Sequence, residues 1–341
     1  MRTESRPALS LNQLLIAKSS HTPFVNPHAS TAETTVLAWA RQSGIYIPGI
    51  KLVLGTASYL YPKTSLERLV VMGKMLTLLF YIDDVYGDLT SSQGLEATAN
   101  EVFTEIEGCC SAFSVKSVPE GAEGDAAIGA FLHIRQEMDG LAPVGWLNRF
   151  SESLSEHLYS SVLPNMYGWN AQAQSVPGYI HVRERTSGMY PTVDFIEFAN
   201  NAYLPQRVIN LPVIGQLRLD VARIGSLSND LFSYHKEVTE QGLLMNLVQV
   251  IQTTEHLSVA QSLQKAVDLI NDATRDFQKS VAQARGTDWR SARLDAQTVE
   301  AIERYITGLE YEISATWYWQ LSTNRYRSAA SPFVELSTPL Q

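Results

Sequence analysis

Hydrophobic residues recur along this chain at the three- and four-residue spacing of amphipathic helices, almost from end to end. The pattern predicts helices over residues 33–43, 65–86, 92–108, 125–139, 144–168, 179–200, 216–239, 243–253, 257–284 and 297–321. The alternation of hydrophobic and polar residues that marks strands joined by tight turns is missing. The chain is therefore predicted to be all-α.

The ends of the chain differ in character from its middle. Residues 1–30 are polar and contain three prolines, which indicates an irregular N-terminal arm. Residues 31–330 form one predicted helical domain, because no linker long enough to separate two domains interrupts them, and residues 331–341 are expected to be a flexible tail. Thr64 and Glu67 have the spacing of a capping box, which predicts the start of the helix over 65–86, and Gly87 is expected to stop it.

Composition narrows the choice of partners and compartment. The chain has 26 Lys and Arg against 35 Asp and Glu, a net charge of −9, which argues against binding to nucleic acid or to an anionic membrane. Cys109 and Cys110 are adjacent and suit a reducing compartment, and the longest apolar stretch, residues 69–82, is too short to span a bilayer. We therefore expect a soluble cytoplasmic protein.

Glycine-rich phosphate loops are absent from the sequence, so any phosphate would be bound through metal ions and basic side chains.

Three carboxylates, those of Asp83, Asp84 and Asp88, follow directly on an apolar helix. Such charge is costly there, because the carboxylates repel one another and the negative end of the helix dipole. A divalent cation would neutralise it, and Mg²⁺ suits hard oxygen ligands. In an α-helix Asp84 and Asp88 would share one face, with Asp83 turned about 100° away. A solvated acidic helix end is the alternative interpretation, and this segment alone does not decide between the two.

A second polar segment lies at the end of the helix predicted over 216–239. Asn229, Ser233 and Glu237 are spaced by four residues, so they would line one helical face over roughly 12 Å. Their amide, hydroxyl and carboxylate oxygens form a mixed site for a hard cation, and Lys236 beside them would hold an anion. The alternative is an ordinary polar stripe on a solvated helix.

Together the two segments resemble the paired metal motifs of class I terpene synthases. The second has the family's N-D-x-x-S-x-x-K-E form at every defining position, namely Asn229, Asp230, Ser233, Lys236 and Glu237. The resemblance covers residues 23–327 and is to the bacterial-type, single-domain members. It implies an antiparallel helical bundle with a central active-site cavity, three bound Mg²⁺ ions (with Mn²⁺ as a substitute), and an isoprenyl diphosphate as substrate. Members of the family are often homodimers, although no surface stripe in this sequence indicates one.

The resemblance also implies roles for single residues. The expected metal ligands are Asp83, Asp84, Asp88, Asn229, Ser233 and Glu237. The family's diphosphate-sensing arginine stands 46 residues before the motif's Asn, which is Arg183 here. Arg185 is the alternative; about 200° of helical rotation separates the two, and the 46-residue spacing favours Arg183. Lys236 and the C-terminal pair Arg325-Tyr326 would bind the same diphosphate. The sequence departs from the family pattern at Gly87, four residues after Asp83, so Asp83 is expected to be the main ligand of the first motif, with the parts of Asp84 and Asp88 left open.

A carbocation formed by loss of diphosphate needs a dry cavity whose walls stabilise it without attacking it. The candidate wall residues are Phe80 and Trp319, followed by Tyr81, Tyr190 and Trp317. Thr186, Ser187 and Gly188 match the place where relatives break a helix and expose backbone carbonyls to the substrate. Each aromatic residue has plain core packing as its alternative role.

The function predicted from these features is Mg²⁺-dependent ionisation and cyclisation of a linear isoprenyl diphosphate. Farnesyl diphosphate is the expected substrate and geranylgeranyl diphosphate the alternative, because cavity depth cannot be inferred from sequence. A prenyl chain-elongating synthase is disfavoured, since the second motif is not aspartate-rich. An all-α nucleotide pyrophosphohydrolase would need an E-x-x-D motif that the sequence lacks, and a non-catalytic helical adaptor would leave Arg183 and Arg325-Tyr326 unexplained.

Overall fold

Helices account for every regular element among the residues that the structure describes. The computed structural model describes residues 9–18, 24–87, 96–117, 124–162, 175–289 and 293–340. The longer helices are α1 (Ala29–Gln42), α3 (Leu66–Ile82), α5 (Glu96–Ser114), α6 (Ala126–Asp139), α7 (Val144–Val162), α9 (Val176–Thr186), α10 (Met189–Asn200), α12 (Pro212–Tyr234), α13 (Leu247–Glu255), α14 (Val259–Gly286) and α15 (Ala296–Ser322). The shorter elements are η1 (Leu11–Gln13), η2 (Leu15–Lys18), η3 (Pro48–Leu52), α2 (Thr56–Leu60), η4 (Asp83–Gly87), α11 (Gln206–Ile209), η5 (His235–Glu240), η6 (Asn324–Tyr326) and η7 (Val334–Leu336).

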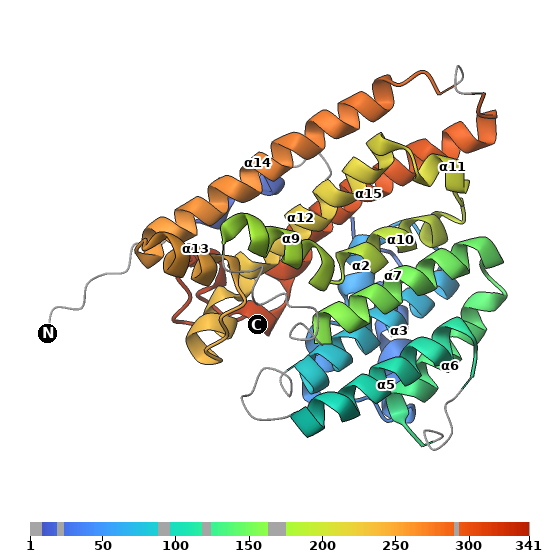
Figure 1. Cartoon of the computed structure of the whole chain (residues 1–341), viewed down its shortest axis with the longest axis horizontal. Helices are drawn as coiled ribbons and strands as arrows, with labels where there is room; N and C mark the ends of the chain where they lie inside the picture. The colour runs from blue at the N-terminus through green and yellow to red at the C-terminus, as the bar shows by residue number, and fades with distance from the viewer. Residues whose placement is uncertain are drawn as a thin grey trace, which may run out of the picture.

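These helices form a bundle in which α10 connects two groups. Helices α3, α5, α6 and α7 pack together, as do α9, α12, α13, α14 and α15, and α10 contacts α7, α12 and α15 (Figure 1). Helix α3 is apolar on almost every side and is buried along most of its length, as expected of a central helix. The all-α prediction is confirmed.

Besides the predicted helix over 65–86, which is α3 followed by the π-helical turn η4, two predicted helices are each divided into two elements. The predicted helix over 179–200 is α9 followed by α10, with the break at Ser187 and Gly188. The predicted helix over 216–239 is α12 followed by the π-helical turn η5. Hydrophobic periodicity did not indicate either division, because the apolar spacing continues across both.

The predicted capping box at Thr64 is wrong. Helix α3 begins one residue later, after Ser65, whose side chain makes no capping hydrogen bond. The Thr64 hydroxyl instead donates to the carbonyl of Ala199, 2.9 Å away at the end of α10. The Thr64 hydroxyl therefore makes a tertiary hydrogen bond, whereas in a capping box its oxygen would have accepted from a backbone N–H of the first turn.

The C-terminal residues, predicted to be a flexible tail, pack against the N-terminal arm. Phe333 and Leu336 are buried, and Leu9 pairs with Phe333 in an isolated β-bridge. The hydroxyl of Ser10 donates to the Glu335 carboxylate at 2.5 Å. These contacts join the N-terminal and C-terminal ends of the described chain. Among the described residues, no helix is long and apolar enough to cross a membrane.

Candidate active site

Each acidic motif includes residues on a π-helical turn that continues a long helix. Turn η4 extends α3 and carries Asp83 and Asp84, while η5 extends α12 and carries Lys236 and Glu237. A π-helical turn closes i→i+5 hydrogen bonds and changes the direction of its side chains, and such turns are frequent at functional sites. The helical faces predicted for Asp83 and Asp84 from α-helical spacing therefore do not apply. Asp88 lies outside the described residues.

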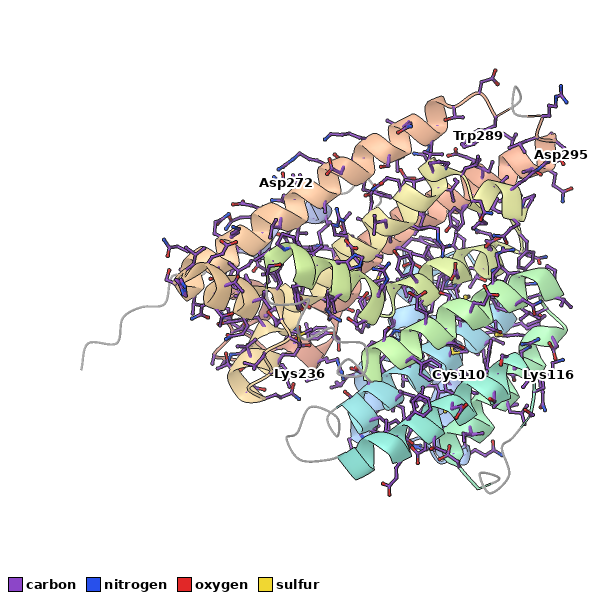
Figure 2. The ribbon with its side chains drawn as sticks, in the orientation of Figure 1. Cys110, Lys116, Lys236, Asp272, Trp289 and Asp295 are labelled. Atoms are coloured by element: carbon purple, nitrogen blue, oxygen red, sulfur yellow. The ribbon has the colours of Figure 1, made fainter. Side chains whose placement is uncertain are left out.

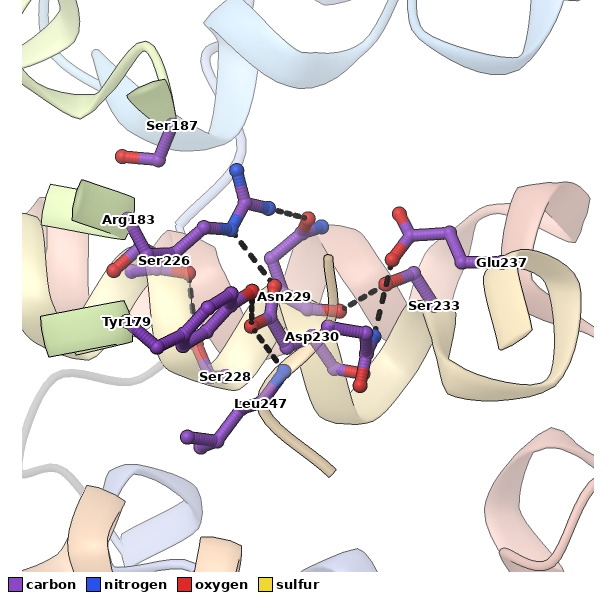
Figure 3. A network of polar contacts seen from close by, with 12 residues as sticks. Tyr179, Arg183, Ser187, Ser226, Ser228, Asn229, Asp230, Ser233, Glu237 and Leu247 are labelled. Carbon is purple, nitrogen blue, oxygen red and sulfur yellow. Dashed lines mark hydrogen bonds and ion pairs between the residues drawn. The ribbon is translucent and has the colours of Figure 1, made fainter. Parts of the chain in front are cut away.

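The side chain of Asn229 is fixed by partners from the C-terminal part of the chain. Its amide nitrogen donates to Gln320 Oε1 and to the Tyr326 hydroxyl, both at 3.0 Å. This orients its oxygen toward Arg183, whose Nη2 donates to it at 3.2 Å (Figure 3). The motif's amide and the arginine expected to sense diphosphate are thus in direct contact.

Ser233 and Glu237 continue the row begun by Asn229 along the same side of the helix (Figure 3). The Ser233 hydroxyl donates to the backbone carbonyl of Asn229 at 2.8 Å, which leaves its oxygen able to face a cation. Glu237 Oε2 accepts a hydrogen bond from Asn246 Nδ2 at 3.0 Å. Burial, and then the nearby charge of Asp230, raise the pKa of Glu237, which indicates a carboxylate short of positive charge.

Asp230, the next residue of the motif, has a different role. It is fully buried and accepts three hydrogen bonds: from the Tyr179 hydroxyl at 2.6 Å, from Arg183 Nε at 2.8 Å and from the backbone N–H of Leu247 at 2.9 Å (Figure 3). Burial alone would lower the pKa of Arg183, but the charge of Asp230 raises it, so the guanidinium stays charged. Asp230 therefore positions Arg183 rather than facing a metal. Sequence reasoning assigned no role to Tyr179 or Asn246, and the only signal for Asp230 was its place in the motif.

Asp84 is already paired in this structure. Arg325 donates to it from Nη2 at 2.9 Å and from Nη1 at 3.3 Å, so both carboxylate oxygens are engaged. The neighbouring residue, Tyr326, contacts Asn229 of the other motif. The Arg-Tyr pair on η6 thus joins the first acidic motif to the second.

Asp83 is accessible to solvent, yet protein surrounds it closely enough to change its ionisation. Burial and the charge of Asp84 raise the pKa of Asp83, while Arg325, Arg183 and Lys236 act in the opposite direction. These three cations come from η6, α9 and η5, and Lys236 is labelled in Figure 2. Asp83 is therefore within electrostatic reach of Lys236 of the second motif, of Arg183, which that motif holds, and of Arg325, which pairs with Asp84. The two motifs thus face a common site.

The donor set fits a hard divalent cation. Its members are carboxylate, amide and hydroxyl oxygens, and burial, followed by the charge of a neighbouring Asp, raises the pKa of both Asp83 and Glu237, so a bound cation would favour their ionised forms. Within the described ranges no three His, Cys, Asp or Glu side chains gather as a metal site. The second motif would not form such a cluster, because two of its three expected ligands, Asn229 and Ser233, supply an amide and a hydroxyl oxygen in place of carboxylates.

The candidate wall residues divide into two groups. The rings of Phe80 and Trp319 lie 5.9 Å apart, and Trp319 meets Tyr326 edge-on at 6.0 Å, so these rings border the Arg-Tyr pair. Trp317 instead packs on Phe232 of α12 at 5.8 Å. The pKa of Tyr81 is raised by burial and by Asp125 and Glu105, which places its hydroxyl toward α5 and α6. The structure therefore brings Phe80 and Trp319 beside the Arg-Tyr pair. Trp317 lies one ring further away, because the ring of Phe232, on which it packs, is 6.5 Å from that of Tyr326.

The helix break lies next to Arg183. Helix α9 ends at Thr186, Ser187 caps it, and Gly188 takes a left-handed conformation with φ of 74° before α10 begins. Only glycine adopts that conformation without strain, which explains its presence here. Arg185, two residues from Arg183, contacts His181 and Glu156 instead.

Comparisons with known proteins agree with this geometry. The family described as "Terpene synthase family 2, C-terminal metal binding" matches residues 74–276. The chain is 26% identical to (+)-T-muurolol synthase ((2E,6E)-farnesyl diphosphate cyclizing) of Roseiflexus castenholzii, over 89% of this chain and 90% of that protein. It is also 26% identical to 10-epi-cubebol synthase of Sorangium cellulosum, over 89% and 95% respectively.

The fold has relatives among solved structures. The crystal structure of α-eudesmol synthase superimposes with a TM-score of 0.77 at 17% identity, covering 89% of this chain and 97% of that one. The family match covers more than half of the chain and includes both motifs, the Arg183 network and the helix break. This chain belongs to the terpene synthases of family 2 and has the class I terpene synthase fold.

Proposed function

We propose that this enzyme ionises and cyclises farnesyl diphosphate in a Mg²⁺-dependent reaction and releases diphosphate. The observation that carries the proposal is the Arg325-Tyr326 pair, which contacts Asp84 of one motif and Asn229 of the other. A diphosphate held between the motifs would meet these side chains together with Arg183 and Lys236. The name of the Roseiflexus relative specifies farnesyl diphosphate, which supports a fifteen-carbon substrate.

The metal would be held by oxygen ligands from both motifs. We assign Asn229, Ser233 and Glu237 to one part of the site, and Asp83 with Asp84 and Asp88 to the other, with three Mg²⁺ ions in all and Mn²⁺ as a substitute. When bound, the cations neutralise the charge that develops on the departing diphosphate. Because Asp84 is paired with Arg325 in this structure, Asp83 is the member of the first motif that is free to bind metal among the described residues.

The chain's own groups would then bind and activate the diphosphate. Asp230 and Asn229 hold the guanidinium of Arg183 in place, so little reorganisation is needed when the anion arrives. Lys236, Arg325 and the Tyr326 hydroxyl would donate to the remaining oxygens. Each donor is strengthened by the low local dielectric of a partly buried site.

The hydrocarbon end would lie among apolar groups. Phe80 and Trp319 present aromatic faces beside the site, each of which stabilises a cation by about 1–2 kcal/mol when water is excluded. The carbonyls around Thr186, Ser187 and Gly188 would orient the allylic carbons at the moment of ionisation. T-muurolol, cubebol and eudesmol are alcohols, so we propose that water captures the last cation here as well.

The test is an incubation of the purified protein with geranyl, farnesyl and geranylgeranyl diphosphate, each with and without Mg²⁺. We expect Mg²⁺-dependent release of diphosphate and a cyclic C15 alcohol from farnesyl diphosphate, identified by gas chromatography and mass spectrometry. Turnover of only the C20 substrate would replace the proposal by a diterpene synthase. If none of the three substrates releases diphosphate, the proposed function is refuted. Sedimentation of the same preparation tests for the homodimer that the family suggests.

A further inference from the structure

The imidazole of His157, on α7, lies against the helix break. A Cβ atom placed on Gly188 would lie 3.3 Å from both Cε1 and Nε2 of His157 and 3.9 Å from Nδ1. The edge of the ring that carries both nitrogens therefore faces Gly188. The glycine gives the ring room to approach the backbone at the point where α9 ends and α10 begins.

His157 lacks the partners that other histidines of the chain have. Its Nδ1 is shielded from solvent and has no hydrogen-bond partner. By contrast, His133 accepts a hydrogen bond from Trp39, His181 contacts Arg185, and His235 pairs with Glu240. A buried polar atom without a partner is uncommon in native proteins and calls for an explanation, of which a catalytic role is one.

The surroundings keep this ring neutral. Burial and the positive charge of Arg183 lower the pKa of His157 to about 4. At neutral pH the imidazole therefore carries one nitrogen with a free lone pair and is ready to accept a proton. Any proton it accepts is held weakly, because the imidazolium would be desolvated and repelled by Arg183.

The proposed reaction needs such a base at its end. The last carbocation becomes a neutral product only by losing a proton, either from a carbon next to the charge or from a water molecule that has just added to it. We propose that His157 is the base that receives this final proton. This inference rests on the proposed function, which places the ionising end of the substrate at the break beside His157.

The step balances in both cases. If a carbon loses the proton, the electrons of its C–H bond form the new double bond and the proton joins the imidazole lone pair. If water adds, a lone pair of its oxygen forms the C–O bond and one O–H bond breaks, with that proton passing to the imidazole. The imidazolium then transfers the proton to the released diphosphate held by Arg183, and the neutral base is restored.

The experiment compares His157→Phe, which keeps the ring but removes both nitrogens, with the wild type on farnesyl diphosphate and Mg²⁺. We expect the share of the wild-type product among all C15 products to fall at least tenfold, with products of other termination sites replacing it. His181→Phe is the matched control, because His181 is an exposed histidine on α9, and its product ratio should stay unchanged. A parallel reaction in ¹⁸O-labelled water shows whether the proton came from water or from carbon.

The outcomes separate this inference from the proposed function. If the wild type releases no diphosphate, the proposed function has failed. If the wild type is active and folded His157→Phe gives the wild-type product ratio, then another base, such as diphosphate itself, ends the reaction and the inference is overturned. A folded variant that loses turnover without a change in product ratio also overturns it. Should His157→Phe not fold, as judged by thermal melting, His157→Gln decides by the same product ratio.

Discussion

The acidic residues of the site have different numbers of partners, and that difference separates their roles. Asp230 accepts three hydrogen bonds, with both oxygens engaged by buried protein groups, and is closed off from solvent, so it acts by holding Arg183. Asp83 and Glu237 have raised pKa values because burial and like charges outweigh the nearby cations. Carboxylates in that state gain most from a divalent ion.

Replacement of Glu237 by Gln should therefore remove metal affinity and activity together. The amide is a weaker ligand for Mg²⁺, and we expect kcat/KM to fall about 100-fold, with a higher Mg²⁺ concentration needed for half-maximal rate. Steady-state kinetics over a Mg²⁺ titration measures both effects. Glu240→Gln is the control, since Glu240 is on the same π-helical turn but pairs with His235. Equal behaviour of the two variants would contradict the metal assignment of Glu237.

Replacement of Asp230 by Ala should destabilise the fold as well as the site. It leaves the Arg183 guanidinium and the Tyr179 hydroxyl without their buried acceptor, and removal of one partner of a buried pair costs about 3–5 kcal/mol. Urea denaturation should show this loss in the free energy of unfolding. Asp276→Ala, which removes an exposed carboxylate on α14, should change it by less than about 0.5 kcal/mol. If the free energy of unfolding of the Asp230 variant falls by less than about 1 kcal/mol, then the hydrogen bonds of Asp230 are not what holds Arg183 in place.

Glu312 gives a prediction for pH. It is fully buried on α15, its Oε2 lies 3.1 Å from the Thr192 hydroxyl, its Oε1 has no partner, and burial raises its pKa to about 8. In the unfolded chain a Glu titrates near 4.3. Between these values the native protein holds a proton that the unfolded chain has released, so stability falls as pH rises from about 4.5 to about 8.

The test compares the wild type with Glu312→Gln by urea denaturation at several pH values across that window. Gln keeps the shape and the contact to Thr192 but does not titrate. The wild type should lose on the order of 1 kcal/mol per pH unit relative to the variant. Parallel stability curves would show that Glu312 is ionised in the native protein.

At the scale of elements, the site depends on interruptions of otherwise regular helices. The turns η4 and η5 and the break between α9 and α10 direct the motif side chains and the backbone toward one place. Periodicity predicted the helices because burial on one face repeats along each of them. It did not predict the π-helical turns, which depend on how tertiary contacts redirect a few residues.

The break itself gives a prediction. Gly188→Ala forces a side chain into a left-handed conformation and against the His157 ring, and should cost about 1–2 kcal/mol of stability. Gly129→Ala is the matched control, because Gly129 is inside α6 with open space around it. That substitution should stabilise the protein by about 0.5–1 kcal/mol. Thermal melting of both variants checks the opposite signs, and a Gly188 variant as stable as the wild type would contradict the account of the break.

At the scale of the whole molecule, the net charge of −9 describes the surface and says little about the site. The resemblance to class I terpene synthases singled out Arg183, which stands 46 residues before Asn229, and Arg325 of the C-terminal Arg-Tyr pair. The pairing of Arg325 with Asp84 could not be predicted, because it joins residues 241 positions apart that only the packing of the bundle brings together. The same holds for Asn246, which reaches Glu237 from the segment before α13.

The site is assembled from both groups of helices, so its ligands should stabilise the whole chain. Asp83 and Asp84 follow α3, whereas Arg183, Asn229 and Glu237 come from α9, α12 and η5. Mg²⁺ with inorganic diphosphate at about 100 times the dissociation constant should add about 2.7 kcal/mol and raise the melting temperature by about 5 °C. Mg²⁺ alone or diphosphate alone should not raise the melting temperature in this way, because each binds tightly at the site only when the other is present. Glu240→Gln should keep the shift and Glu237→Gln should lose it, and an equal shift in both variants would place the binding of diphosphate elsewhere on the molecule.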